Sequence, residues 1–490
     1  MSARAQRIAV NSALLFYANV LTSGVSLVLV AVLARYLGTA GFGRYGYVIS
    51  FNELLVVLSE LGLSKILVRE VAQEPNRTAD HLSMAWTLRL LLSGLVLAIV
   101  FLSTGGQTEP QLRTAIWVYA GSQLIFNLTE LFLSVFRAYQ RMELQALVVT
   151  VAQVLILALT LGAVALKLDL VWVFAAALAA NAARFFLGWA VVARRFAPLR
   201  LSRDGRGMGS MFWESAPVGI SLLLRRYIWR GGVVLLAAWQ GDMAAGILYG
   251  PLRIVEQMRI VPMSLVGSIL PMLANRARRS PEEFGRGLEK SLKVFMVLSL
   301  LLAVTLTFLA EPIVQVVLGE ELRESAGTLR LLGWAVVFTF PNLLFGTALT
   351  AVGRQTWETV GLALGLAVGY LAMRLSMPAG GALAVCWGIL AAEGTFLALG
   401  LAATRRYLDW RRLAPFGGKA AVAAAAAAGV FLLGRELHFL LQLTLGPLTF
   451  GLALLALRAL EPDEWETLGA MLPGALRRRL ARLWPQRNSP

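Results

Sequence analysis

Three arginines lie near the middle of one long apolar segment, residues 211–239: Arg225, Arg226 and Arg230. Arg226 and Arg230 are four positions apart and share one face of a helix, whereas Arg225 is turned about 100° away from Arg226. A charge at the centre of a membrane costs at least about 2.5–3.5 kcal/mol on insertion scales, so it usually faces a cavity or a partner. Because the arginine fork matches phosphate oxygens, this spacing predicts a water-filled cavity that binds an anion.

Further charged residues lie within other apolar segments: Arg184, Arg253, Arg259, Glu53, Glu60 and Glu256. In one interpretation the arginines of both groups bind an anionic headgroup, and the three acids line the cavity or hold a coupling ion. In the other, they form structural ion pairs between helices, such as Arg253 with Glu256 and Arg230 with Glu53. The sequence around Arg226 contains no nearby acid, which favours the anion site.

The composition identifies the kind of protein that must position these charges. Hydrophobic residues make up 58% of the chain and charged residues 15%, against about 45–50% and about 25% in soluble proteins. This excludes a soluble globular enzyme, a disordered chain and a secreted disulfide scaffold. The chain has one cysteine, Cys386, and two distant histidines, His81 and His438, so we expect no disulfide, no metal site and no cofactor.

The apolar residues form continuous blocks long enough for transmembrane helices, each of which needs about 20 residues. Continuous rather than alternating apolar runs favour helices over a β-barrel. We expect the first block to be a retained membrane helix rather than a signal peptide. The predicted spans are 11–34, 45–63, 84–103, 114–135, 144–166, 170–193, 211–239, 244–272, 291–318, 327–350, 356–376, 380–403, 419–434 and 440–460.

The basic residues are distributed unequally between the two sides of these fourteen spans. Of the 45 lysines and arginines, thirty fall in segments on the side of the N-terminus, seven on the other side and eight within spans. The positive-inside rule therefore places both termini in the cytoplasm. The net charge of +17 is explained by this placement, and we expect no nucleic-acid partner. The basic segment 463–484 is either a helix on the inner leaflet or a solvated tail.

Three residues of one hairpin recur in a second hairpin 203 positions later. Six spans separate the two hairpins, so both would have the same orientation, as in a parallel repeat of two six-helix halves. Because glycine is common in this chain, a chance match is the alternative. The matched residues are Gly38, Gly43 and Glu53 in the first hairpin and Gly241, Gly246 and Glu256 in the second.

Short motifs along the chain resemble the Wzx-type polysaccharide flippases of the MOP transporter superfamily. The resemblance extends to about residue 420 and depends on the order of the motifs. They are Ala34-Arg35-Tyr36-Leu37-Gly38, Gly41-Phe42-Gly43-Arg44-Tyr45, Glu60-Leu61-Gly62-Leu63, Glu214-Ser215-Ala216-Pro217, Gly246 through Tyr249, Leu270-Pro271 and Ala351-Val352-Gly353-Arg354-Gln355.

This resemblance implies an all-α polytopic membrane protein of about 14 transmembrane helices. Two six-helix lobes, residues 1–200 and 201–418, would form the V-shaped arrangement of MOP and MATE transporters. Residues 419–460 would add two C-terminal helices, and residues 461–490 a basic amphipathic tail.

The resemblance also implies a transporter and not an enzyme. It would move a polyprenyl-(di)phosphate-linked oligosaccharide from the cytoplasmic to the outer leaflet of the inner membrane by alternating access, for cell-surface or exopolysaccharide assembly. The phosphates would meet the arginines of the spans 211–239 and 244–272. The implied partners are this glycan, membrane lipids, and polysaccharide polymerase and export machinery. The implied driving force is a Na⁺ or H⁺ gradient or the membrane potential.

Two departures from related branches refine this expectation. The family commonly has an acid where this chain reads Trp229-Arg230-Gly231, which argues against a cation site there and leaves the coupling ion open. Lipid II flippases usually carry an Arg-Asp pair where this chain reads Gly43-Arg44-Tyr45. A lipid II flippase and a MATE-like exporter are the alternatives within the superfamily, although an arginine-rich cavity would repel the cations that MATE exporters handle. A membrane polysaccharide polymerase or ligase is the alternative of another class, but the short loops offer no catalytic constellation.

Overall fold

The computed structural model describes residues 3–107, 109–461 and 464, and these residues form helices with no β-strand among them. The predicted basic helix at 463–484 lies outside this part of the chain, except for Glu464. The structure divides into two compact units, residues 1–260 with 317–322, and residues 261–316 with 323–490. The predicted division of the chain into two six-helix lobes at residue 200 remains a prediction.

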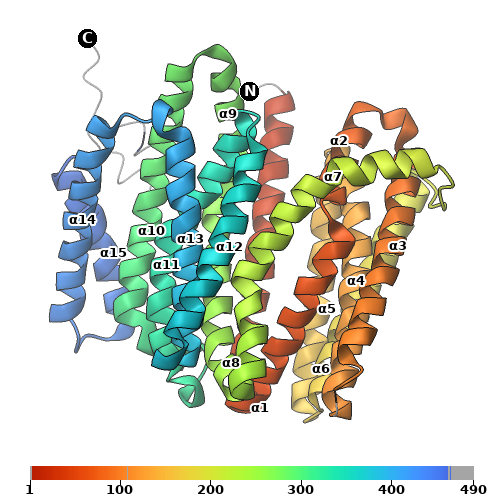
Figure 1. Cartoon of the computed structure of the whole chain (residues 1–490), viewed down its shortest axis with the longest axis horizontal. Helices are drawn as coiled ribbons and strands as arrows, with labels where there is room; N and C mark the ends of the chain where they lie inside the picture. Colours follow the sequence, from red (N-terminus) through yellow and green to blue (C-terminus); the bar gives the residue numbers. More distant parts are fainter. Residues whose placement is uncertain (1–2, 108, 462–463, 465–490) are drawn as a thin grey trace. The chain divides into compact units, whose positions relative to one another are not determined.

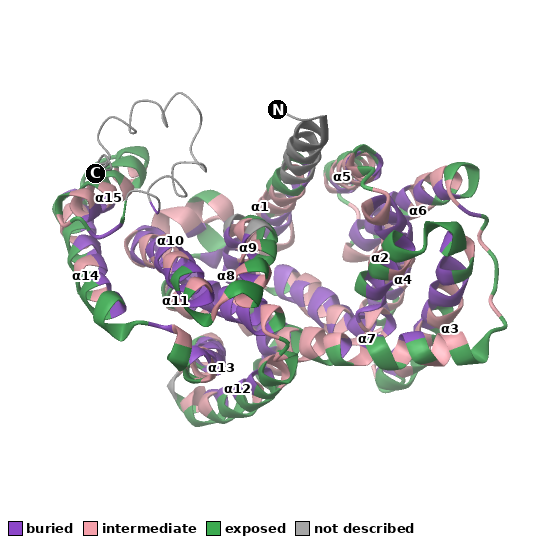
Figure 2. Ribbon diagram, turned by 90° about the horizontal axis from the view of Figure 1, so that it is seen from above, coloured by how far each residue is buried: buried purple, intermediate pink, exposed green. Residues whose placement is uncertain are grey.

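The first unit contains the helices from α1 to α8. The helices are α1 (Ala3–Glu60), α2 (Leu63–Gln73), η1 (Pro75–Arg77), α3 (Thr78–Thr104), α4 (Pro110–Ala138), α5 (Met142–Ala165), α6 (Leu170–Arg195), α7 (Gly205–Arg226), the π-helical turn η2 (Tyr227–Gly231) and α8 (Gly232–Met258), together with the short η3 (Glu320–Leu322). Buried residues, drawn in purple, lie along α3, α4 and α6 in Figure 2.

The second unit contains nearly all of α9 and the helices that follow it. They are α9 (Ile260–Arg279), α10 (Pro281–Val317), α11 (Ser325–Ala351), α12 (Gln355–Ser376), η4 (Met377–Ala379), α13 (Gly381–Thr404), η5 (Arg405–Tyr407), α14 (Trp410–Leu433) and α15 (Phe439–Ala456). Within this unit α12 lies beside α13 (Figure 1), and each helix approaches the other closely at a glycine, Gly369 on α12 and Gly388 on α13.

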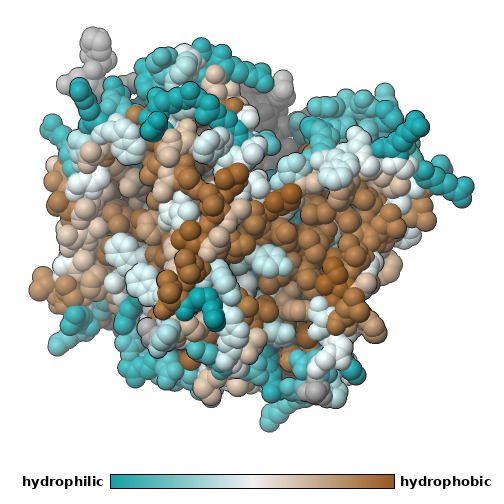
Figure 3. Space-filling view, in the orientation of Figure 1, coloured by the Kyte–Doolittle hydropathy of each residue, from teal (hydrophilic) through white to brown (hydrophobic). Residues whose placement is uncertain are grey.

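Every predicted span lies mostly on helical residues, which confirms the prediction of an all-α membrane protein. Eleven helical stretches among the described residues are long and apolar enough to cross a membrane. Gly205–Arg279 contains two of the predicted spans, and Tyr17–Gln73 contains one and most of another, whereas the more polar α4 is not among the eleven. In both units, apolar side chains cover the middle of the visible helices and hydrophilic side chains gather at the helix ends (Figure 3).

The three repeated residues occupy equivalent positions in the two hairpins, which lie within the first unit. Gly38 interrupts α1 with φ 67° and ψ 177°, and Gly241 interrupts α8 with φ 83° and ψ −179°, a backbone region essentially restricted to glycine. Beyond each break, a glycine packs against the other hairpin: Gly43 lies against the Asp242 carbonyl, and Gly246 against that of Thr39. The structure therefore supports the predicted repeat at the level of these hairpins.

The loops of the first unit gather into two sets, as alternating spans require. At one end, the Arg44 guanidinium lies 2.7 Å from a Glu109 carboxylate oxygen and 2.8 Å from one of Asp242. The Tyr36 hydroxyl donates to the Leu168 carbonyl at 2.8 Å. All of these residues belong to segments that the sequence analysis placed together outside.

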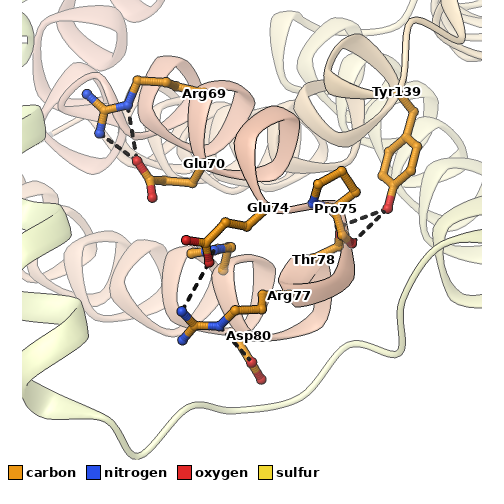
Figure 4. A network of polar contacts seen from close by, with 9 residues as sticks. Arg69, Glu70, Glu74, Pro75, Arg77, Thr78, Asp80 and Tyr139 are labelled. Carbon is orange, nitrogen blue, oxygen red and sulfur yellow. Dashed lines mark hydrogen bonds and ion pairs between the residues drawn. The ribbon is translucent and has the colours of Figure 1, made fainter.

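The opposite end of the first unit joins segments that the sequence analysis placed together inside (Figure 4). Tyr139 is the first residue after α4. Its hydroxyl oxygen lies 2.9 Å from the Thr78 hydroxyl oxygen and 3.1 Å from the Pro75 carbonyl oxygen. Arg77 pairs with Glu74 at 3.1 Å across the same turn. The grouping of the loops matches the predicted alternation of the spans within this unit.

Candidate functional site

Arg230 lies at the centre of a buried charge network in the first unit. It belongs to the π-helical turn η2, which widens the helix for five residues between α7 and α8, and such turns often occur at functional sites. Its side chain is only 2% exposed. The Arg230 Nε donates to Glu53 Oε2 at 2.9 Å, and its Nη2 donates to Glu256 Oε2 at 2.6 Å.

Arg226 extends this network toward the surface of the unit. It lies one turn before Arg230, and its Nη1 donates to the same Glu53 oxygen at 3.0 Å. The Arg226 side chain is 50% exposed, whereas that of Glu53 is 12% exposed. Arg226 is therefore the arginine of this network that a ligand can reach with the least rearrangement.

Arg253 connects the network to the first half of α1. Its Nη1 donates to Glu256 Oε2 at 3.2 Å, and its Nη2 donates to the Ser26 hydroxyl at 3.0 Å. Gln257 Nε2 donates to the same hydroxyl at 3.1 Å. The network thus joins three guanidinium groups and two carboxylates, which leaves one formal positive charge.

A cavity of about 190 Å³ lies beside Arg253, within the first unit. Its apolar wall includes Leu29, Ile49, Val173 and Phe174. The polar groups that line it come from four helices and are the side chains of Thr22, Ser26, Tyr45, Tyr119, Gln153, Thr160 and Arg253. Two of these residues, Thr22 and Ser26, belong to the first predicted span.

Aromatic rings pack at and beside this cavity. The ring of Tyr45 stacks on that of Phe174 at 5.4 Å and meets that of Tyr249 edge-on at 5.9 Å. The Arg230 guanidinium lies 5.7 Å from the centre of the Tyr249 ring. Among the described residues, three buried polar atoms of this region have no hydrogen-bond partner, Arg230 Nη1, Arg253 Nε and the Tyr249 hydroxyl. Buried groups of this kind usually bind water or a ligand.

Arg184, another predicted site residue, has its contacts outside the network. Arg184, on α6, pairs with Glu130 at 2.6 Å and stacks over the Phe126 ring at 4.1 Å. The Arg259 guanidinium lies 5.3 Å from the Trp229 ring. Arg225 is half-buried beside Arg226, and Glu60 is half-buried at the end of α1. The structure therefore unites Arg226, Arg230, Arg253, Glu53 and Glu256 of the nine predicted residues.

The structure corrects one argument from the sequence. The arginines of the span 211–239 have no acid near them along the chain, but α1 brings Glu53 into contact with two of them. The ion pairs Arg230–Glu53 and Arg253–Glu256, which the alternative interpretation predicted, are both present. The role of the arginines in binding an anion stays a prediction.

Two completely buried residues of the first unit were not among the predicted site residues. Arg89 is one of them, and its Nη1 donates to the Asn127 carbonyl at 2.6 Å. Tyr249 is also completely buried, beside Arg230. No spacing rule along the chain would single them out, because both depend on contacts with distant helices.

The charge network places donor guanidinium groups against acceptor carboxylates. Its carboxylates accept hydrogen bonds from arginines, and no nucleophile adjoins a base within it. Among the described residues, no group of three or more histidines, cysteines or acids could hold a metal ion. Each guanidinium group of the network thus already has a carboxylate partner, Glu53 or Glu256.

The fold is that of the MOP superfamily of flippases and transporters. The lipid II flippase MurJ in an inward closed conformation superposes with a TM-score of 0.74 at 12% identity, over 91% of this chain and 98% of that chain. An inward-facing multidrug resistance MATE family transporter superposes with a TM-score of 0.65 at 13% identity, over 79% and 93%. A MOP superfamily transporter from Pyrococcus furiosus gives 0.57 at 14% identity, over 80% and 95%.

The chain belongs to the polysaccharide biosynthesis protein family, whose sequence model matches residues 8–277. The matched part includes the complete charge network and the cavity beside it. No curated protein sequence matches the chain significantly. Together with the eleven long apolar helical stretches, the likeness to these flippase and transporter structures indicates a multi-pass membrane protein.

Proposed function

We propose that the protein moves a polyprenyl-(di)phosphate-linked oligosaccharide from the cytoplasmic to the outer leaflet by alternating access. The observation that supports this proposal is the network of three arginines and two glutamates, which has an excess positive charge and an accessible member, Arg226. The guanidinium fork can donate two parallel hydrogen bonds to phosphate oxygens, and the electrostatic attraction between the two groups is stronger in a low-dielectric site than in water. The family of the chain agrees with a glycan as the cargo.

In this mechanism the carboxylates stabilise the arginines while no ligand is bound. A phosphate oxygen that reaches Arg226 replaces one hydrogen bond from this arginine to Glu53. Glu53 keeps its contact with Arg230, so the protein does not leave a buried carboxylate without a partner. The glycan would use the polar lining of the neighbouring cavity only in part, because 190 Å³ is small for an oligosaccharide.

The proposed location is the inner membrane, with both termini in the cytoplasm. The grouping of the loops in the first unit supports alternating spans, and the basic residues favour the cytoplasm for the inside set. We also propose that an ion gradient or the membrane potential drives the cycle, since moving one elementary charge across 100 mV changes the free energy by about 2.3 kcal/mol. Polymerase and export machinery would receive the flipped glycan.

Proteoliposomes test the proposed transport directly. The purified protein is reconstituted with a labelled undecaprenyl-diphosphate oligosaccharide, and a membrane-impermeant glycosidase reports the glycan that reaches the opposite leaflet. Arg226→Gln should reduce the rate at least about tenfold, because a hydrogen bond to a charged group contributes about 1.5–3 kcal/mol. The matched control Arg113→Gln changes an exposed arginine of α4 and should transport at the wild-type rate.

The same assay separates the proposed function from its alternatives. The mass of the glycan should stay unchanged, whereas a polymerase or ligase would alter it. Lipid II tested in place of the oligosaccharide should move more slowly, and faster movement would assign the protein to the lipid II branch. Equal transport by wild type and Arg226→Gln would contradict the role of the charge network.

A further inference from the structure

A second basic site lies in the other unit, at the hairpin between α9 and α10. The helix α9 ends at Arg279 and α10 begins at Pro281, so Ser280 alone joins them. The Ser280 hydroxyl accepts a hydrogen bond from the Glu283 backbone N–H at 3.1 Å and caps α10. This cap fixes the first turn of α10 against the last turns of α9.

The two helix ends enclose a pocket of about 380 Å³ with an excess of positive charge. The polar groups that line it are the side chains of Asn275, Arg276, Arg279, Glu283, Arg286 and Lys290. Four cations thus face one carboxylate. A neighbouring pocket, lined by the start of α10 and the segment around Arg406, shares Arg286 with the first one and contains three arginines and three acids, so its formal charges balance.

Few carboxylates neutralise the cations of this pocket. Glu283 lies 4.0 Å from Arg279, at the limit of an ion pair, and Lys290 lies 3.5 Å from Glu461. Among the residues that the structure describes, Arg276 and Arg286 have no carboxylate within ion-pair distance. Two guanidinium groups of the pocket are therefore available for an external anion.

The position of Arg276 depends on a glycine of the facing helix. A Cβ atom built on Gly287 would lie 2.7 Å from Arg276 Nη1 and 3.1 Å from its Cδ. Glycine inside a helix costs about 0.5–1 kcal/mol relative to alanine, and here it makes room for the arginine side chain to lie across α10. The packing of the hairpin thus holds a guanidinium at the pocket.

We propose that this pocket binds the phosphate of an anionic lipid headgroup. The pocket lies at the ends of two long apolar helices, which is the level of the headgroups, and basic pockets between membrane helices on the cytoplasmic side bind anionic lipids. Two guanidinium groups can donate hydrogen bonds to the oxygens of one phosphate from two sides. A free phosphate ion offers the same chemistry without the acyl chains, and the experiment below distinguishes the two sources.

Native mass spectrometry of the purified full-length protein tests this inference. The probes are phosphatidylglycerol, zwitterionic phosphatidylcholine and inorganic phosphate, each added to delipidated protein. The wild type should retain phosphatidylglycerol at least about tenfold more tightly than phosphatidylcholine. The double variant Arg276→Gln/Arg286→Gln should lose this preference. The matched control Arg278→Gln removes an exposed arginine of α9 that does not line the pocket and should bind as the wild type does.

The remaining outcomes decide the source of the phosphate and the proposal itself. If inorganic phosphate competes with phosphatidylglycerol at equal concentration, the pocket takes a free phosphate. Equal retention of phosphatidylglycerol by wild type and double variant would overturn the proposal. If the double variant does not fold, the single variant Arg286→Gln replaces it in the assay, because it changes only an exposed side chain. This single variant should lose part of the preference for phosphatidylglycerol over phosphatidylcholine. The assay contains no glycan, so its result is independent of the proposed transport.

Discussion

Arg230 joins carboxylates from two helices that lie far apart in the sequence. Glu53 comes from α1 and Glu256 from α8, and both accept hydrogen bonds from the same buried guanidinium. Burying such groups is costly, and removing one partner leaves the others with a desolvation cost that nothing offsets. Arg230 therefore has a structural role in addition to any contact with a ligand, whereas Arg226 can change partners.

Arg230→Met should lower the stability of the protein by about 3 kcal/mol or more, because Glu53 and Glu256 each lose a buried partner. The measurement is the thermal unfolding midpoint in detergent, with Arg113→Met as the exposed control. Adding Glu256→Gln should cost less in the Arg230→Met background than in the wild type, since the two residues share one interaction. Additive losses would contradict a direct ion pair.

The packing of the two hairpins determines where the charged residues meet. A Cβ atom on Gly43 would lie 1.7 Å from the Asp242 carbonyl oxygen, and one on Gly246 would lie 2.3 Å from that of Thr39. The backbones of α1 and α8 therefore touch without intervening side chains. Because Glu53 and Glu256 follow these contacts by the same number of residues, the repeat places both acids at the level of Arg230.

Gly43→Ala should destabilise the protein by about 1–3 kcal/mol, as overpacking typically does, because the rigid backbone of α8 cannot yield as a side chain would. Gly24→Ala on the same helix is the matched control, since a Cβ there meets no atom within 4 Å. This control should be neutral or slightly stabilising. The thermal unfolding midpoints of the two variants compare these effects, and a neutral Gly43→Ala would show that the hairpins separate easily.

The alternation of the loops is a property of the whole chain. Basic residues concentrate in one set of loops, and within the first unit the structure brings the members of each set together. Moving a positively charged loop across the membrane is disfavoured, so this distribution predicts the orientation of the spans. The orientation can be measured because the chain has a single cysteine, Cys386, which is buried.

Cysteine labelling should reveal opposite sides for two exposed loop positions. In a Cys386→Ser background, Lys167→Cys should react with a membrane-impermeant maleimide in intact cells. Arg203→Cys should react only after the membrane is opened or inverted, because its loop belongs to the basic set. Labelling of both positions from the same side would refute the predicted alternation, and exchange of the two results would invert the proposed orientation.

The sequence by itself determined the class of fold and the spans. Continuous apolar runs are a local property, and the energetic requirement to satisfy every backbone hydrogen bond in lipid makes each of them a helix. The sequence likewise showed that the residue types and the spacing of Gly38, Gly43 and Glu53 recur in the second hairpin. The sequence also singled out the arginines, since charged residues inside apolar segments are rare without a reason.

Only the tertiary structure decided which charges meet. Glu53 lies more than 170 positions from Arg226 and Arg230 in the sequence, and the contact of α1 with α8 brings these residues within 3.0 Å. It also separated Arg184 from this network and assembled the basic pocket of α9 and α10 around Gly287. Which charged groups pair depends on their distance in space and on the cost of removing each group from water. Neither quantity follows from spacing along the chain.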